Sequence, residues 1–257
     1  MQTSQFMQKA NIRNVDTDIN MEIDPVAKFI LYKVAIDYLA NDLELCLNIC
    51  CTNLSFVANC NLFEGNILRF KGLALEKMYE QKTKEEKEDE EEKDGKHAPK
   101  IEEEDPKDLI CDAIEAVKNA ISIFSNGYDK SLRSKVQSSS HGLALAGFQY
   151  GCLLETYSQD LLADFGNVHL TERLGKLQLS NMDQCHREAR KCFEKAYKDF
   201  EQLNHLKGMY LSKKHLHAVQ TSELRVATEV QVKEMRQKYR EYVHENGLSQ
   251  SCSILRE

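Results

Sequence analysis

Proline is the residue that most firmly stops a helix, and it occurs only at Pro25, Pro99 and Pro106 of the 257 residues. Pro25 and Pro106 each follow an aspartate, the arrangement of a helix N-cap with proline at the first helical position. The 151 residues after Pro106 contain no proline, so none of them obliges a helix to end. No Asn-Gly or Asp-Gly turn joins two alternating β-branched runs. The chain is therefore predicted to be all-α.

Apolar residues recur at helical spacing along the chain. The first helix is expected over 25–39, and its apolar positions are Val26, Phe29, Ile30, Val34 and Tyr38. The second and third helices are expected over 42–59 and 63–80. The third should bury Ile67, Phe70, Leu73, Ala74 and Met78. Further helices are expected over 106–125, 136–157, 182–203, 206–221 and 222–245. The stretch 158–180 is predicted to be a second insertion of mixed character.

The net charge of −7 comes mostly from one segment. Residues 82–108 hold 13 acidic side chains and 7 lysines, so the rest of the chain is nearly neutral. Because the segment 82–107 has almost no apolar residues, we expect a disordered acidic low-complexity insertion or a frayed helical extension. The interleaved lysines favour a solvated spacer over a cation site, and could lengthen a helix through Glu–Lys pairs.

Composition also limits the partners. There is no basic field to attract phosphates, so nucleic acid is an unexpected partner. The sequence contains no run of 18 uncharged apolar residues, the length needed to span a membrane. The first residues lack the pattern of a secretory signal. We therefore expect a cytoplasmic protein with no membrane partner.

Nine cysteines are present, and most lie in helical patterns beside apolar neighbours. We interpret them as reduced core thiols. The densest cluster, Cys46, Cys50, Cys51 and Cys60, contains no C-x-x-C spacing, so no metal site is predicted. Cys185 and Cys192 share a helical face, while His186 points away from it.

No catalytic or cofactor motif stands out. The chain has no phosphate-binding glycine loop and no G-x-S-x-G elbow. His215 and His217 lie on different helical faces, and His141 is expected to be an exposed histidine. We therefore predict a non-enzymatic protein without catalytic, cofactor-binding or metal residues.

Short stretches of the chain resemble one another. The run 72–76 (GLALE) is similar to 151–155 (GCLLE), and each lies late in a helix that follows a turn. A third stretch, from Cys192 through Phe200 and Asn204 to Gly208, has the same order of features. Small residues let neighbouring helices approach closely, and these are Gly72, Ala74, Ala144, Ala146 and Gly151.

These stretches resemble tetratricopeptide (TPR) repeats of a longer variety, in which A-x-x-x-F precedes L-G-[DN]-x-x-G and a second helix. Phe200, Leu203-Asn204 and Gly208 match this pattern, and 113–124 resembles its first helix. The resemblance implies antiparallel helical hairpins stacked as a short TPR-like α-solenoid with a C-terminal capping helix. The chain would then divide into a flexible N-terminus (1–22), helical hairpins (23–81), the insertion (82–107), TPR-like repeats (108–221) and an amphipathic helix with its tail (222–257).

The same resemblance implies a scaffold or adaptor that holds a peptide or helix of a partner protein on its repeat surface. The predicted partner-binding residues are Arg69, Lys71, Gln149, Tyr150, Tyr210 and Lys214. The alternative is a structural subunit that self-associates through a coiled coil of residues 222–245, or a fragment of a larger ciliary, cytoskeletal or signalling assembly.

Overall fold

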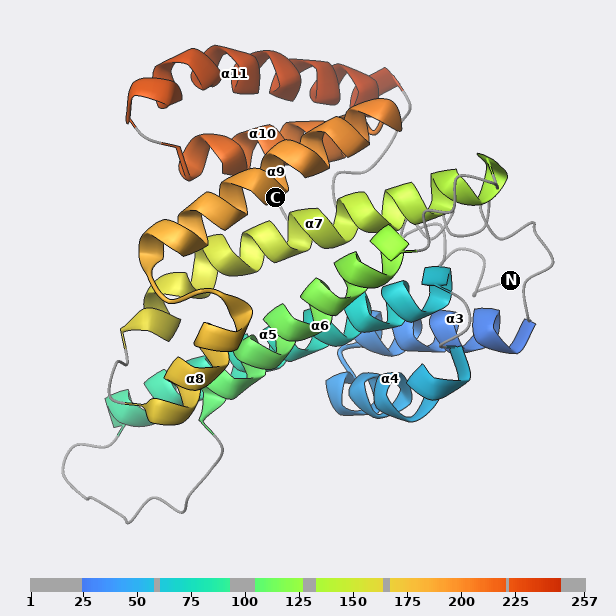
Figure 1. Cartoon of the computed structure of the whole chain (residues 1–257), viewed down its shortest axis with the longest axis vertical. Helices are drawn as coiled ribbons and strands as arrows, with labels where there is room; N and C mark the ends of the chain where they lie inside the picture. Colours follow the sequence, from blue (N-terminus) through green and yellow to red (C-terminus); the bar gives the residue numbers. More distant parts are fainter. Residues whose placement is uncertain are drawn as a thin grey trace.

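The described part of the chain is helical throughout. The computed structural model describes residues 25–57, 61–92, 105–126, 133–163, 167–220 and 222–245, and every regular element in these ranges is an α-helix (Figure 1). The helices are α3 (Pro25–Ala40), α4 (Leu43–Val57), α5 (Asn61–Glu92), α6 (Pro106–Asn126), α7 (Arg133–Leu162), α8 (Val168–Leu177), α9 (Met182–Gln202), α10 (Leu206–Ala218) and α11 (Ser222–Glu245). The all-α prediction is confirmed for these residues.

Both helices that were predicted to begin at a proline do so. Helix α3 begins at Pro25 and α6 begins at Pro106. The carboxylate of Asp105 accepts a hydrogen bond from the Lys107 backbone N–H at 3.0 Å, so it satisfies one of the amides that a helix start leaves unpaired. The predicted segment 1–22 lies outside the described residues.

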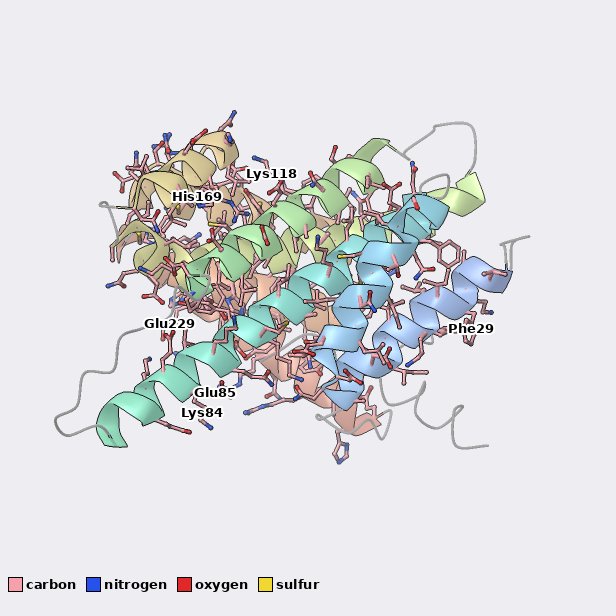
Figure 2. All side chains as sticks on the ribbon, turned by 90° about the horizontal axis from the view of Figure 1, so that it is seen from below. Phe29, Lys84, Glu85, Lys118, His169 and Glu229 are labelled. Carbon is pink, nitrogen blue, oxygen red and sulfur yellow. The ribbon has the colours of Figure 1, made fainter. Side chains whose placement is uncertain are left out.

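Helix α5 is longer than the predicted 63–80. It continues through residues 82–92, so the first part of the predicted insertion is a helical extension. Figure 2 shows Lys84 and Glu85 on this extension, where α5 projects beyond its neighbours. Lys84 Nζ lies 3.7 Å from a Glu88 carboxylate oxygen one turn on, which is the kind of exposed pair that gives an isolated helix modest support. Residues 93–104 of the insertion lie outside the described residues.

The segment 158–180 is also more regular than predicted. Helix α7 continues to Leu162, and α8 follows after a short connection. The Asn167 side chain caps α8 by accepting a hydrogen bond from the Leu170 backbone N–H. The helix ends at Gln178, whose φ of 64° is left-handed. Leu170 and Leu174 are buried, so α8 is part of the packed structure.

Neighbouring helices pack in chain order, from α3 on α4 through α6 on α7. Helix α7 then packs on α9, α9 on α10 and α10 on α11, while α8 lies against α6. The short turns at 41–42 and 203–205, with packing of α3 on α4 and of α9 on α10, are typical of helical hairpins. The result is a layered stack with the α3–α4 hairpin near one end and α11 at the other (Figure 1).

Helix α5 joins two apolar cores. Ile67, Phe70 and Ala74 face a small core shared with α3 and α4. Leu68 and Leu75 face a larger core that continues through α6, α7, α9 and α10 to α11. The prediction that the third helix buries Ile67, Phe70, Leu73 and Ala74 is confirmed, while Met78 is partly buried.

Phenylalanine rings against glycines set the close spacing of the helices. A Cβ added at Gly142 would lie 2.5 Å from the Phe124 ring, and one at Gly65 would lie 2.6 Å from the same ring. The rings of Phe193 and Phe200 stand equally close to Gly151 and Gly208. Because no real Cβ tolerates such distances, these helices can pack as they do only where the facing residue is glycine.

We predict opposite effects for two glycines on α7. Gly151→Ala should lower the free energy of unfolding by about 1–3 kcal/mol, because its methyl would lie 2.7 Å from the Phe193 ring. Gly147→Ala should raise it by about 0.5–1 kcal/mol, because no atom lies within 4 Å of the added methyl and alanine favours the helix. Urea unfolding followed by circular dichroism measures both, and equal effects would contradict the packing described.

Candidate functional site

The six predicted partner-binding residues do not form one exposed surface. Arg69, Gln149, Tyr150 and Tyr210 are buried, Lys71 is partly buried and Lys214 is exposed. Gln149 Nε2 donates a long hydrogen bond of 3.4 Å to the Arg69 carbonyl oxygen, so these two residues connect α7 to α5. A partner could not reach the four buried side chains without separating helices, and their binding role stays a prediction.

Arg69 belongs to a buried polar cluster. Its side chain is 5% exposed, and burial lowers the pKa of its guanidinium to about 10. His141 lies with its ring centroid 5.4 Å from that of His205 and 6.5 Å from that of Phe200. The expectation that His141 is exposed is therefore wrong: the turn before α10 folds back over it.

Both histidines are held neutral. Burial, followed by the charges of His205 and Arg69, lowers the pKa of His141 to about 4. Burial also lowers the pKa of His205, whose Nδ1 accepts a hydrogen bond from the Gly208 backbone N–H at 3.0 Å and so caps α10. A protonated His205 could not accept this bond.

We predict that the free energy of unfolding falls as the pH drops from about 6.5 towards 4. In this window the unfolded chain binds a proton at His141 and the folded chain does not, which removes about 2 kcal/mol by pH 5. His205 acts in the same direction. Urea unfolding at pH 7 and pH 5 measures the loss. His141→Phe should reduce it, whereas His244→Gln, a change at an exposed position of α11, should leave it intact.

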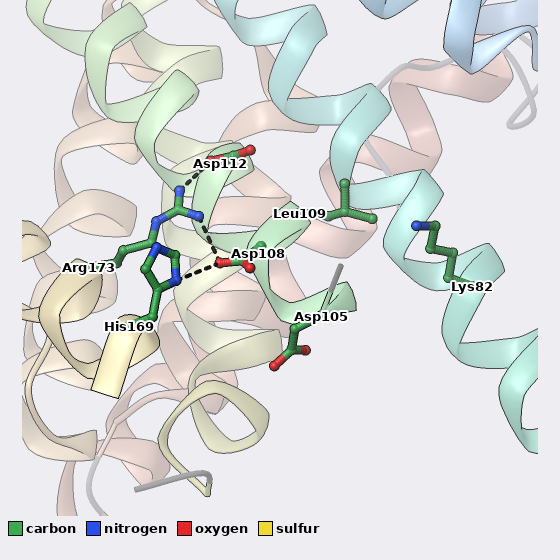
Figure 3. A pocket seen from close by; sticks show the side chains of 7 residues that line it. All are labelled: Lys82, Asp105, Asp108, Leu109, Asp112, His169 and Arg173. Atoms are coloured by element: carbon green, nitrogen blue, oxygen red, sulfur yellow. Dashed lines mark hydrogen bonds and ion pairs between the residues drawn. The ribbon is translucent and has the colours of Figure 1, made fainter. Parts of the chain in front are cut away.

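A polar cavity of about 220 Å³ lies where α8 meets α6 (Figure 3). Arg173 from α8 points to the carboxylates of Asp108, at 2.9 Å, and of Asp112 on α6. His169 Nδ1 lies 3.5 Å from Asp108. Arg173 and His169 are paired with carboxylates of α6, so we interpret the cavity as the ionic contact that fixes α8 on α6. In the described ranges no group of three or more His, Cys, Asp or Glu is placed to hold a metal ion.

Four of the described cysteines lie in the core, as the sequence predicted, and Cys51 does not. Cys46, Cys50, Cys111 and Cys185 are buried and free, and Cys46 Sγ lies 3.6 Å from the Val34 carbonyl oxygen. Cys51 is exposed and Cys192 is partly buried. Cys60 lies outside the described residues.

The outer side of α3 is apolar and open. Phe29 is 68% exposed and Val26 is 52% exposed. Leu39, also in α3, and Leu45, in α4, are exposed as well. Figure 2 shows Phe29 on the side of α3 that faces away from α4 and α5. The opposite side of α3 is buried in the small core, through Ala27, Ile30, Leu31, Val34 and Ala35.

Five residues on the outer side of α3 follow a heptad, of which 26, 29 and 40 are exposed and 33 and 36 are partly exposed. Positions 26, 29, 33, 36 and 40 are separated alternately by three and four residues, which places them on one stripe of the helix. The stripe reads Val26, Phe29, Lys33, Ile36 and Ala40, and we call it the α3 stripe. This spacing is the one with which a helix receives a second helix along its length.

Sequence reasoning missed the α3 stripe. It grouped Val26 and Phe29 with Ile30 and Val34 as one set of apolar positions, but the structure buries the latter two and exposes the former two. The signal was nevertheless present, because α3 is apolar on all sides. Such a helix is usually buried on all sides, yet here only one side is covered.

Comparisons with known proteins give no relative. No protein-family model matches the chain, and neither the curated proteins nor the solved structures include a match. Of the helices described, none combines the length and apolar character needed to cross a membrane.

Proposed function

We propose that this protein is a non-enzymatic helical scaffold that binds a helix of a partner protein along the α3 stripe. The observation that carries the proposal is the exposure of Phe29 and Val26 within a heptad on a helix whose other side is already in the core. Neighbouring exposed apolar side chains on one stripe are typical of a protein-binding surface, whereas single exposed apolar residues are ordinary.

The two ends of the stack differ, and the difference supports the proposal. At one end, α11 buries Met235 and Tyr239 against α10 and exposes mostly polar residues, as a capping helix does. At the other end, α3 exposes its apolar stripe. The terminal element of a helical stack needs a polar outer face, and among the described helices α3 has an apolar one, which favours a further helix on that side.

The packing of the hairpins is consistent with a TPR-like solenoid. In α6–α7 and again in α9–α10, a phenylalanine near the end of the first helix faces a glycine of the second. The two pairs are Phe124 with Gly142 and Phe200 with Gly208. In this interpretation α11 is the C-terminal cap, and a partner helix on α3 continues the stack.

The observed packing of α11 gives the oligomerisation alternative less support. Its Tyr239 ring stacks on Tyr210 of α10 with centroids 5.9 Å apart, and Lys207 Nζ lies 5.9 Å from the centroid of the same ring. These apolar positions are engaged within the chain. Self-association through 222–245 would need the remaining exposed residues, such as Val230 and Tyr242.

We predict that Phe29→Glu lowers the affinity for the partner at least about tenfold, because it replaces the large exposed apolar side chain of the stripe with a charge. The free energy of unfolding should change by less than about 0.5 kcal/mol, because Phe29 is largely exposed. The partner is first captured with the wild-type chain and identified. Binding is then measured by calorimetry between the two purified proteins.

The matched control is Val168→Glu. Val168 is 80% exposed and begins α8, the helix whose His169 lies far from Phe29 in Figure 2. This variant should bind the partner as the wild type does. A partner that binds Phe29→Glu and wild type equally would refute the proposal.

A further inference from the structure

The α3 stripe has a cation at its centre. Lys33 lies between Val26 and Phe29 on one side and Ile36 and Ala40 on the other. Its side chain is 40% exposed and forms an ion pair with Asp37 one turn later. A single charged residue within a heptad stripe selects the partner and its register, because only an opposite charge compensates it when the helices meet.

We infer that the partner helix is acidic at the middle of its apolar stripe, with a glutamate or aspartate that faces Lys33. This inference rests on the proposed function and specifies its ligand. The charged residues of α3 are Lys28, Lys33 and Asp37, and both lysines are more accessible than the aspartate, which is buried. The exposed surface of this helix therefore offers cations without an exposed carboxylate.

Asp37 cannot complete the pairing for a partner. Its side chain is 6% exposed and lies on the buried side of the helix, so its carboxylate pairs with Lys33 from the side of the helix opposite to a partner. One of its oxygens, Oδ2, has no hydrogen-bond partner within the part of the chain that is described. When a partner helix covers the stripe, the ammonium of Lys33 loses water and needs a second acceptor, which a carboxylate of the partner supplies.

The same residue argues against a second copy of this chain as the occupant. The α3 stripe is symmetric about Lys33, so two α3 helices would bring both Lys33 ammoniums together in a parallel or an antiparallel pair. Two like charges in a contact that excludes water repel strongly. Among the residues that the structure describes, the nearest exposed carboxylates along the chain are Asp42 and Glu44, which follow the end of α3 nine and eleven residues after Lys33.

The test uses the full chain and two synthetic helical peptides of identical composition. Both carry leucines at the heptad positions. One has glutamate at the central heptad position and lysine on its outer face, and the other has these two residues exchanged. Fluorescence anisotropy should show that the wild-type chain binds the glutamate-centred peptide at least about tenfold more tightly.

A double variant isolates the charge. Lys33→Met/Asp37→Leu removes both members of the ion pair, so no buried carboxylate is left without its cation. It should remain helical by circular dichroism and bind the two peptides with equal affinity. Phe29→Glu should bind neither.

The outcomes separate this inference from the proposed function. If both peptides bind the wild type equally and Phe29→Glu binds neither, the stripe is a helix-binding surface but the inference about charge is wrong. If neither peptide binds the wild type, both proposals fail. If sedimentation equilibrium shows a wild-type dimer that Phe29→Glu dissociates, the occupant is a second copy and the inference is overturned.

Discussion

The contact between a phenylalanine ring and a facing glycine is the constraint on which the rest of the structure depends. Phe124 of α6 fits between Gly65 of α5 and Gly142 of α7, so one ring sets the spacing of three helices. Phe193 and Phe200 repeat the contact further along the stack. Helices α5, α6, α7, α9 and α10 are thereby held against one another, and α5, which faces both cores, holds the α3–α4 hairpin with its apolar stripe outward.

Much of this fold could be predicted from the sequence, because the signals are local. The two Asp-Pro pairs identified helix starts, apolar spacing identified the helices, and Gly72 and Gly151 were correctly recognised as sites of close approach. The extension of α5 and the presence of α8 were less evident. Exposed Glu–Lys pairs stabilise a helix weakly, and α8 is fixed by the ionic contact of Arg173 with Asp108 and Asp112, residues far away in the chain.

The surface that we propose as the binding site could not be predicted in the same way. Tyr150 and Tyr210 resemble surface residues in an amphipathic pattern, but inner helices of the stack contact neighbours on several sides and bury them. His141 is partly buried because a distant turn packs against it. Conversely, the sequence pattern predicts a core position for Phe29, which is exposed. How many helices surround α3 depends on where α3 lies among the described helices and not on the sequence of α3.

The central claim is that a helix of another protein contacts the α3 stripe, and photo-crosslinking tests it most directly. A photoreactive phenylalanine analogue at position 29 lies in the proposed contact, and the same analogue at position 168 lies on α8, far from Phe29. We expect a covalent adduct from position 29 alone. Mass spectrometry should map the attachment to a helix of a different protein, and that helix should have an acidic residue within its apolar stripe. Adducts that form equally from both positions, or only between copies of this chain, would contradict it.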